Sequence, residues 1–419
     1  MEIQRAKGTR DFLPEDKILR DNIINTIKEV FELYGYNPLE TPVLERFDIL
    51  SSKYTGGAEI LKETFKLKDQ GGRDLALRYD LTVPLARVIG MNPNLKMPFK
   101  RYQIADVFRD GPIKAGRYRV FMQCDVDIVG CKDVRADAEM LNIAKDVFNR
   151  LKLDIIIKVN NRKILDTVMD YAGIEKEKRD MTILSIDKLE KLGLKYVEDE
   201  LKNNGLKKKQ IKDLINIITI KGSNNEKVEK LKKLLKNQEW VKEIEELLKY
   251  SDAEFDVSLA RGLSYYTGNI FEVYLRNSEI KSSVAAGGRY DKMIGSLIGR
   301  GEYPAVGISF GLDVITDAIK LDKKLEFKKS IAKVYVIPIK TFDKCIKMIQ
   351  SLRVNGINVD IDLMDRGISK NLDYADKLGI PFVLIIGEDE LKKNKLKLRD
   401  MKSGKEEMLN IDGIIKKLR

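Results

Sequence analysis

The chain has 419 residues, which at about 150 residues per domain predicts two or three domains. Hydrophobic residues make up 43% and charged residues 34%, a composition typical of globular proteins that excludes a largely disordered chain. No apolar run approaches the roughly 20 residues of a membrane helix, and the three scattered cysteines exclude a disulfide framework. We therefore expect a cytoplasmic protein without a membrane partner.

The sequence contains no histidine, which excludes Ser-His-Asp catalysis, Cys-His catalysis and metal ligation by imidazole. Its formal net charge of +12 favours a polyanionic partner such as nucleic acid. A lysine-rich surface without such a partner would give the same charge, because only clustering on one face is diagnostic.

The first elements alternate between helix and sheet. Apolar residues at helical spacing predict a helix between Pro14 and Gly35, and short alternating segments predict a sheet over 36–129. Helical spacing returns over 133–150. Residues 175–251 are rich in Lys and Glu, lack proline and carry leucines at heptad-like spacing, which predicts a helical insertion.

The remaining segments predict a second part of the sheet and a separate unit. Strand-like alternation runs from Phe255 to about Val273 and is followed by a glycine-rich stretch at 285–311. A polar linker leads to an α/β unit. Its expected elements are strands at 332–339, 357–363 and 381–387, helices at 343–356 and 371–380, a hairpin at 395–409 and a short final helix.

Residues 99–130 predict two strands joined by a glycine-containing loop. Alternation in the second strand places apolar side chains on one face. The other face carries Arg117, Arg119, Phe121, Gln123, Asp125 and Asp127. Because polar groups are costly to bury, this face either lines a polar pocket or is the solvent face of an antiparallel sheet.

Two further segments favour a pocket. In RDLALRYDLTVP (73–84), alternation places Arg78, Asp80 and Thr82 on one side. Arg261 precedes a glycine and a tyrosine pair, which indicates close approach of the backbone to a ligand, although a hairpin with aromatic pairs would look the same. No Walker loop or dinucleotide fingerprint occurs, so ATP would bind on a sheet through arginines.

Six segments together resemble the class II aminoacyl-tRNA synthetases and, within them, the histidyl-tRNA synthetase family. They are KGTRDFLP (7–14), LRYDLTVPLAR (77–87), FRDGPIKAGRYR (108–119), QCDVDIVG (123–130), RGLSYYTGNIFE (261–272) and AGGRYD (286–291). The resemblance implies an α+β fold in which helices flank an antiparallel sheet, with a helical insertion and a C-terminal α/β anticodon-binding domain. The implied divisions are 1–174 and 252–322 for the catalytic domain, 175–251 for the insertion, 323–330 for the linker and 331–419 for the anticodon-binding domain.

The resemblance also implies an activity. A histidine–tRNA ligase activates L-histidine with ATP, releases pyrophosphate and transfers histidine to the 3′ end of tRNA(His), and family members form homodimers. Mg²⁺ would neutralise the ATP phosphates. The implied histidine-binding residues are Asp80, Leu81, Thr82, Arg109, Arg117, Gln123, Asp127, Arg261, Tyr265, Tyr266 and Tyr290. The implied ATP-binding residues are Arg109, Phe121, Arg289 and Arg300, with Arg109 and Arg261 catalytic.

Each of these residues has a role that the resemblance implies. Arg109 would hold the α-phosphate, Arg261 would offset the charge that develops there, and Phe121 would stack on adenine. Asp80 and Thr82 would bind the α-amino group of the substrate, and Arg117 would lie near its carboxylate. Gln123, Asp127 and Tyr266 would bind the imidazole, and Tyr265 and Tyr290 would flank it.

One motif departs from the family pattern. The third class II motif ends in an arginine that holds the γ-phosphate, but here Val314 follows Asp313. Either Arg289 or Arg300 substitutes, or the ATP tail is held more loosely.

Two other functions are compatible with parts of this pattern. The first is a catalytically inactive, histidine-sensing regulatory paralogue, a class that tends to lose the catalytic arginines and the anticodon domain, whereas this chain keeps Arg109 and Arg261. The second is a synthetase for threonine, proline or glycine, which would need zinc ligands or a smaller pocket.

Overall fold

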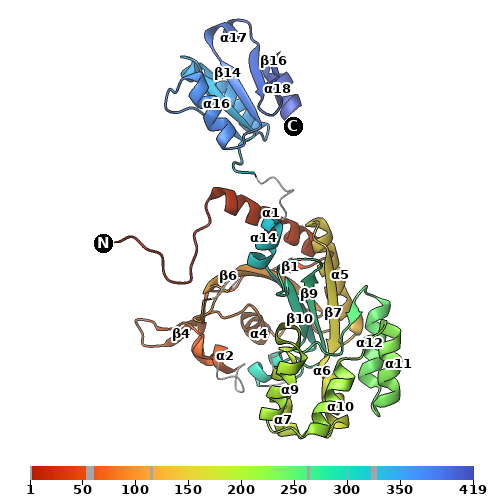
Figure 1. Cartoon of the computed structure of the whole chain (residues 1–419). Helices are drawn as coiled ribbons and strands as arrows, with labels where there is room; N and C mark the ends of the chain where they lie inside the picture. Colours follow the sequence, from red (N-terminus) through yellow and green to blue (C-terminus); the bar gives the residue numbers. More distant parts are fainter. Residues whose placement is uncertain (1, 53–60, 114–116, 262–264, 300, 322–327) are drawn as a thin grey trace. The chain divides into compact units, whose positions relative to one another are not determined.

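The computed structural model describes residues 2–52, 61–113, 117–261, 265–299, 301–321 and 328–419 (Figure 1). The chain forms two compact units, one of Met1–Arg10 with Ile23–Asp322 and the other of Asp11–Asn22 with Lys323–Arg419. Within the described residues, no helix is long and apolar enough to cross a membrane.

The first unit is built around an eight-stranded sheet with the strand order β1-β5-β6-β11-β10-β9-β7-β8. Its strands are β1 (Asn37–Pro38), β5 (Phe99–Phe108), β6 (Val120–Val129), β7 (Ile155–Asn161), β8 (Glu254–Phe255), β9 (Asn269–Leu275), β10 (Ala285–Arg289) and β11 (Ala305–Gly311). All pairs from β5 to β7 in this order are antiparallel, and only the two edge strands pair in parallel. The expected antiparallel sheet is confirmed.

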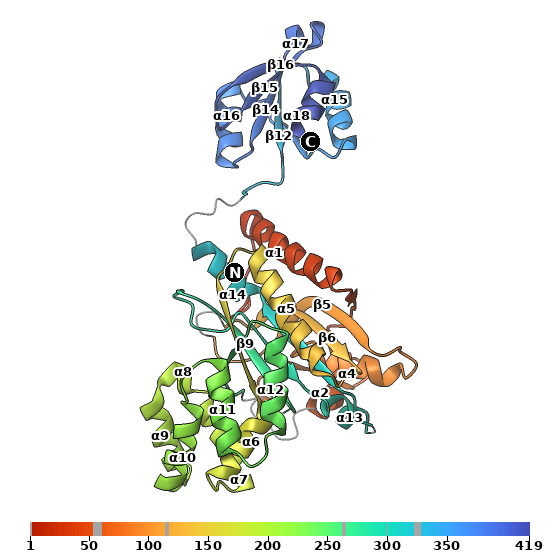
Figure 2. The ribbon, with the colours of Figure 1, turned by 90° about the vertical axis from the view of Figure 1, so that its right-hand side faces the viewer.

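Helices cover both faces of this sheet. They are α4 (Thr82–Met91), α5 (Val134–Arg150), α13 (Met293–Ile298) and α14 (Leu312–Leu321), together with the part of α1 (Pro14–Leu33) that follows Asn22. On one face, Phe31 of α1 and Phe148 of α5 both pack against Phe310 of β11, and Figure 2 shows α5 lying along the strands. On the other face, α4 and α13 pack against each other and around Val129. The polar residues of β6 lie on this second face, beside the start of α4.

Within the described residues, the predicted sheet over 36–129 includes the unexpected helices α2 (Phe47–Ser52) and α4. Alternation after Asp74 therefore ends with β4 (Asp74–Leu77). Pro84 is compatible with α4 because it lies in the first turn, where backbone N–H groups have no acceptor within the helix. The strand β4 belongs to a small three-stranded sheet with β2 (Leu44–Arg46) and β3 (Lys66–Lys68).

Among its described residues, the predicted strand from Phe255 to Val273 is strand at its two ends, in β8 and β9. Arg261 lies in the connection between them, whereas alternation predicted an extended segment. The connection leaves the sheet after β8, so Arg261 is free of the strand pairing that would fix its direction.

Helices form the segment between β7 and β8, of which the periodicity predicted the part over residues 175–251. They are α6 (Arg162–Tyr171), α7 (Lys176–Ile186), α8 (Leu189–Leu192), α9 (Leu194–Asn203), α10 (Lys208–Ile218), α11 (Asn224–Leu234) and α12 (Glu239–Lys249). Helix α11 begins with a capping box in which Ser223 and Glu226 satisfy each other's backbone N–H groups. Helix α12 contacts α5 and β7, so these helices share a core with the sheet.

The second unit contains a five-stranded sheet of order β13-β12-β14-β15-β16. Its strands are β12 (Val334–Pro338), β13 (Val359–Ile361), β14 (Phe382–Ile386), β15 (Leu396–Asp400) and β16 (Glu406–Leu409). Its helices are α15 (Phe342–Val354), α16 (Ile368–Lys377), α17 (Glu388–Lys392) and α18 (Ile411–Leu418). Only the short α17 was not predicted. Both faces of the sheet carry buried apolar clusters.

Candidate active site

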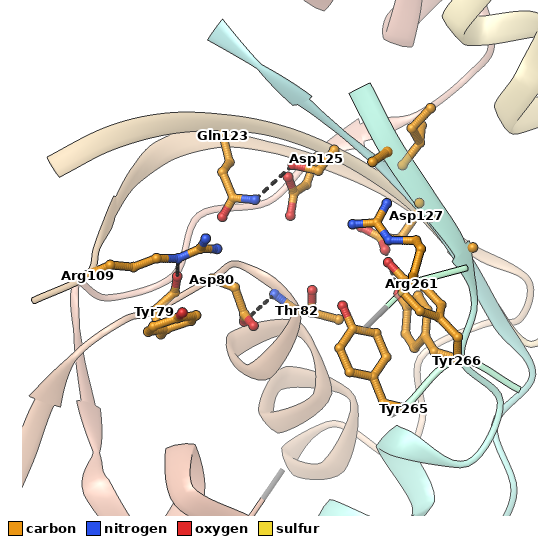
Figure 3. Close-up of a pocket in the computed structure, with 17 residues that line it drawn as sticks. Tyr79, Asp80, Thr82, Arg109, Gln123, Asp125, Asp127, Arg261, Tyr265 and Tyr266 are labelled. Carbon is orange, nitrogen blue, oxygen red and sulfur yellow. Dashed lines mark hydrogen bonds between the residues drawn. The ribbon is translucent and has the colours of Figure 1, made fainter. Parts of the chain in front are cut away.

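A cavity of about 230 Å³ lies on the α4 side of the large sheet (Figure 3). Strands β6, β10 and β11 supply one wall, the segment before α4 a second, and the tyrosine pair a third. The lining residues are Tyr79, Asp80, Thr82, Arg109, Gln123, Asp125, Asp127, Arg261, Tyr265, Tyr266, Ala286, Gly287, Gly288, Tyr290, Gly307, Ile308 and Ser309. This volume suits a ligand smaller than a typical drug molecule.

Strand alternation directs Gln123, Asp125 and Asp127 of β6 into the cavity. Cys124 and Val126, between them, are fully buried on the opposite face. Of the two interpretations of this strand, the polar pocket is confirmed for these three residues, whereas Arg117, Arg119 and Phe121 of the same predicted face do not line the cavity.

Asp127 is held from two directions. Arg101, directly opposite on β5, is fully buried and places Nη2 2.8 Å from Asp127 Oδ2. Tyr290 donates its hydroxyl to Asp127 Oδ1 at 2.5 Å. Burial and the neighbouring Asp127 raise the pKa of Tyr290 well above its ordinary value, so the phenol keeps its proton. Asp127 is therefore held in place in the cavity wall by Arg101 and Tyr290.

Asp125 has a different environment. Burial raises the pKa of its carboxyl to about 7, while Arg101 lowers that pKa and Asp127 raises it further. The carboxyl therefore changes charge near neutral pH. Asp125 was recognised on the polar face of β6 but was not among the predicted ligand-binding residues.

Asp80 is fixed by the start of α4. Its Oδ1 accepts the backbone N–H groups of Thr82 at 3.0 Å and Val83 at 2.9 Å. The Leu81 side chain is fully buried, but its carbonyl accepts a hydrogen bond from Arg101 Nη2 at 3.2 Å. Leu81 thus takes part through its backbone, and only its two neighbours line the cavity.

Arg109 lies at the other end of the cavity, between two aromatic rings. Its guanidinium carbon is 4.3 Å from the centroid of Tyr79 and 4.8 Å from that of Phe121. Its Nε donates to the Tyr79 carbonyl at 3.3 Å. The rings hold the cation through their faces, so Phe121 lies beside Arg109 without lining the cavity itself.

Arg261 and the tyrosine pair form a third wall. The Arg261 guanidinium lies over the Tyr266 ring at 5.3 Å, and its Nη1 is 3.6 Å from Glu272 Oε1. Tyr265 contacts the rings of both Tyr266 and Tyr290. Residues 262–264 of the same motif lie outside the described residues.

Two of the predicted residues lie elsewhere. Arg117 is half-exposed and forms a two-pronged hydrogen bond with Glu63 at 2.8 and 2.9 Å. Arg289 points away from the cavity and is paired with the fully buried Asp137. Arg300 lies outside the described residues.

The environment of Arg289 argues against the prediction that it binds ATP. Besides Asp137, it donates to the carbonyl of Cys131 at 2.9 Å and to Asp291 at 3.3 Å. Removing this arginine from Asp137 would leave a buried carboxylate without its charge partner, which is strongly unfavourable. The guanidinium is therefore committed to the core.

The neighbourhood of Val314 contains another arginine. Arg10 donates to Asp313 Oδ1 at 2.5 Å and stacks on the Tyr118 ring, 3.4 Å from its centroid. The backbone N–H of Arg119 donates to the Gly8 carbonyl at 2.9 Å, which ties this N-terminal segment to the end of the 108–119 motif. Arg10 was not among the predicted site residues.

Sequence reasoning missed Tyr79 and Ser309 as site residues, and it noted the glycines of β10 and β11 only as a glycine-rich stretch. Ser309 lies opposite Asp125 in the β6–β11 register and accepts a hydrogen bond from Gln123 Nε2 at 2.9 Å. Gly307 lies opposite Asp127 in the same register. The signal for these residues is cross-strand register, which requires the order of the strands. In the part of the chain that the structure describes, no group of three or more Cys, Asp or Glu residues could hold a metal ion.

Comparison with known proteins gives consistent matches over the whole chain. The family model for histidyl-tRNA synthetase matches residues 8–315, and the anticodon binding domain model matches residues 333–419. Histidine--tRNA ligase 1 of Bacillus cereus is 44% identical over 418 residues, which cover 97% of this chain and 95% of that protein. Histidine--tRNA ligase of Clostridium tetani is 37% identical, with 98% and 96% covered.

Solved structures give the same result. The crystal structure of histidyl-tRNA synthetase from Nostoc sp. PCC 7120 has a TM-score of 0.89 and 33% sequence identity, and it covers 100% of this chain and 99% of that chain. A Bacillus halodurans structure titled as an ATP phosphoribosyltransferase regulatory subunit/histidyl-tRNA synthetase has a TM-score of 0.74, 22% identity and coverage of 90% and 97%. At that identity, the second likeness supports the fold alone.

Proposed function

The chain belongs to the histidyl-tRNA synthetase family and is an ATP-dependent aminoacyl-tRNA ligase, and from this premise we propose that the cavity beside α4 is where histidine is activated. One observation carries the proposal: six side chains predicted from scattered motifs line a single cavity of about 230 Å³. They are Asp80, Arg109, Gln123, Asp127, Arg261 and Tyr266.

The arrangement gives each part of histidine a partner. Asp80 accepts from the α-ammonium group, while Gln123, Asp127 and Tyr266 surround the imidazole. Imidazole offers one donor and one acceptor when neutral and two donors when protonated. A site with fixed polar partners leaves them unsatisfied around an apolar analogue, which can produce discrimination of ~10⁴–10⁵.

The first chemical step needs no protein base. The histidine carboxylate attacks the α-phosphorus of ATP, a new O–P bond forms, and the bond to the bridging oxygen of pyrophosphate breaks. Arg109 and Arg261 stabilise the charge on the α-phosphate and align the reactants. The terminal ribose hydroxyl of tRNA then attacks the activated carbonyl, and AMP leaves.

ATP and tRNA extend beyond the cavity. Phe121 is placed to stack on adenine beside Arg109, and Mg²⁺ enters with the triphosphate, whose oxygens are suitable ligands for it. The unit beginning at residue 331 binds the anticodon arm of tRNA(His), a role supported by the match to the anticodon binding domain model. The protein works in the cytoplasm as a homodimer, so gel filtration with light scattering should give twice the chain mass of 48.0 kDa.

Amino-acid-dependent ATP–pyrophosphate exchange tests the activity. We expect exchange with histidine and background rates with the other standard amino acids. Tight histidine binding without exchange would instead support the regulatory paralogue. Exchange with threonine, proline or glycine would overturn the assignment of the cavity.

The role of Arg261 gives a second test. Replacing Arg261 with alanine should lower the exchange rate by ~10²–10³, because a preorganised charge contact to the transition state is lost. Arg276→Ala, at an exposed arginine following β9, is the control and should leave the rate unchanged. A loss below about tenfold for Arg261→Ala would assign the charge stabilisation to another cation.

A further inference from the structure

Asp125 lies in the middle of the cavity face of β6, between Gln123 and Asp127 (Figure 3). It is 5% exposed. Its Oδ1 and the Gln123 Oε1 have no hydrogen-bond partner among the residues that the structure describes. A buried acceptor without a donor costs free energy and needs an explanation. Two such atoms side by side on one cavity wall indicate that a ligand supplies the missing donors.

The two aspartates of β6 differ in the hydrogen-bond and ion-pair partners that the protein supplies to their carboxylate oxygens. One carboxylate oxygen of Asp127 accepts a hydrogen bond from Tyr290, and the other lies beside Arg101. Arg101 also affects Asp125, but its hydrogen bond goes to Leu81 and its closest carboxylate is Asp127. Both oxygens of Asp127 therefore lie beside a donor of the protein, whereas Asp125 retains an oxygen for a ligand.

Groups from every neighbouring element act on the Asp125 carboxyl. Arg101 and Gln103 face it from β5, Asp127 from β6, Ser309 from β11, Asp80 from the segment before α4 and Tyr265 from the third wall. Gln103 is turned to Thr41, to which its Nε2 donates at 2.9 Å. Burial prevails over Arg101 and Ser309 and raises the pKa of Asp125 to about 7. A proton is thus readily available at this position near neutral pH.

We propose that Asp125 binds the second ring nitrogen of histidine and that one proton is shared between them, so that the cavity binds histidine together with a proton. This inference rests on the proposed function, which places the imidazole between Gln123 and Asp127. Asp127 accepts from one ring N–H. The other ring nitrogen faces Asp125. It either donates an N–H of the imidazolium to the carboxylate or accepts the proton of the carboxylic acid through its lone pair.

The proposal has a consequence for pH. Free imidazole has an ordinary pKa of about 6.5, and Asp125 has a pKa of about 7. Above these values both groups lose the proton that the complex needs. The apparent affinity for histidine should then fall about tenfold per pH unit, as linkage to one proton requires.

An asparagine at position 125 provides the critical test. Its amide N–H can donate to the ring nitrogen at any pH, as a protonated aspartate does. We therefore expect kcat/KM for histidine in pyrophosphate exchange to fall about tenfold per pH unit above about pH 7.5 in the wild type, and to become nearly independent of pH in Asp125→Asn. Asp106→Asn is the matched control, because Asp106 is exposed and lies opposite Met122, on the other face of the sheet. It should keep the wild-type profile.

The outcomes separate this inference from the proposed function. If the wild type lacks histidine-dependent exchange, the proposed function fails. If exchange occurs but Asp125→Asn keeps the wild-type pH profile, or loses the same factor at every pH, the inference is overturned, because Asp125 then serves the α-ammonium group or the fold. Calorimetry of histidine binding to the wild type at pH 8 needs no variant. In buffers of different ionisation enthalpy, it should show uptake of nearly one proton, and uptake of none would overturn the inference.

Discussion

Gly307 shows how closely single residues determine the shape of the cavity. A Cβ on this residue would lie 2.0 Å from Asp127 Oδ1 and 2.9 Å from the Val126 carbonyl oxygen, so the neighbouring residues of β6 would have to shift. Gly288 has φ +157°, and a Cβ there would lie 2.6 Å from the Asn269 carbonyl oxygen. The glycines are therefore required by the approach of Asp127 and Tyr266 to the strands, and not by turns.

Replacing Gly307 with alanine should raise the histidine KM by about tenfold or more, because overpacking of 1–3 kcal/mol would displace Asp127. Pyrophosphate exchange with varied histidine measures this effect. Gly311→Ala, in the same strand, is the control, since the atom nearest to the added Cβ would be the Val284 carbonyl oxygen at 3.7 Å. Equal KM values for the two variants would contradict the proposed position of histidine.

At the scale of elements, the N-terminal segment around Gly8 and Arg10 borders the site. Backbone hydrogen bonds connect Gly8 to Arg119 and Arg119 to Arg109. The side chain of Arg10 meanwhile reaches Asp313 at the start of α14. The segment thus places a guanidinium beside Val314, where the family pattern has its own arginine.

Arg10 should therefore act on ATP. We expect Arg10→Ala to raise the KM for ATP by about tenfold, as for the loss of a hydrogen bond to a charged group worth roughly 1.5–3 kcal/mol, with a much smaller change in the KM for histidine. Arg5→Ala, at an exposed arginine in the same segment, is the matched control. An equal rise in both KM values would show that the segment positions the whole site.

At the scale of the whole molecule, the charge is the dominant feature. The net charge of +12 is spread over a chain whose C-terminal part matches an anticodon binding domain model. The proposed histidine partners are side chains that line one cavity, whereas a nucleic acid would be attracted by the charge of the surface.

The salt concentration should therefore affect tRNA binding much more than the activation of histidine. We expect the Kd for tRNA to rise by at least ~10³ between about 50 and 200 mM salt, as for a protein that neutralises about six phosphates or more. The KM for histidine in exchange should change far less, because its partners are buried. Filter binding and exchange assays over this range measure both. A shallow salt dependence of tRNA binding would assign the lysine excess to a solvated surface.

Much of this protein follows from local patterns in its sequence. Alternation over residues 120–129 determined which side chains of β6 share a face, because side-chain direction in a strand depends only on neighbours along the chain. Helical spacing predicted α1, α5 and the helices of the insertion for the same reason. The motifs likewise identified Asp80, Arg109, Gln123, Asp127, Arg261 and Tyr266 as one set.

Only the tertiary structure decided which partners those side chains meet. Arg289 is on a motif and was expected at ATP, but the order of strands and helices places Asp137 beside it in the core. Asp125 differs from Asp127 because the ion pair of Arg101 and the hydrogen bond of Tyr290 both go to Asp127. Cross-strand register brings together residues that are far apart in the chain, and the fold determines which of them are buried. The charge state of a buried group and its unsatisfied hydrogen-bonding capacity therefore depend on the fold and not on the local sequence.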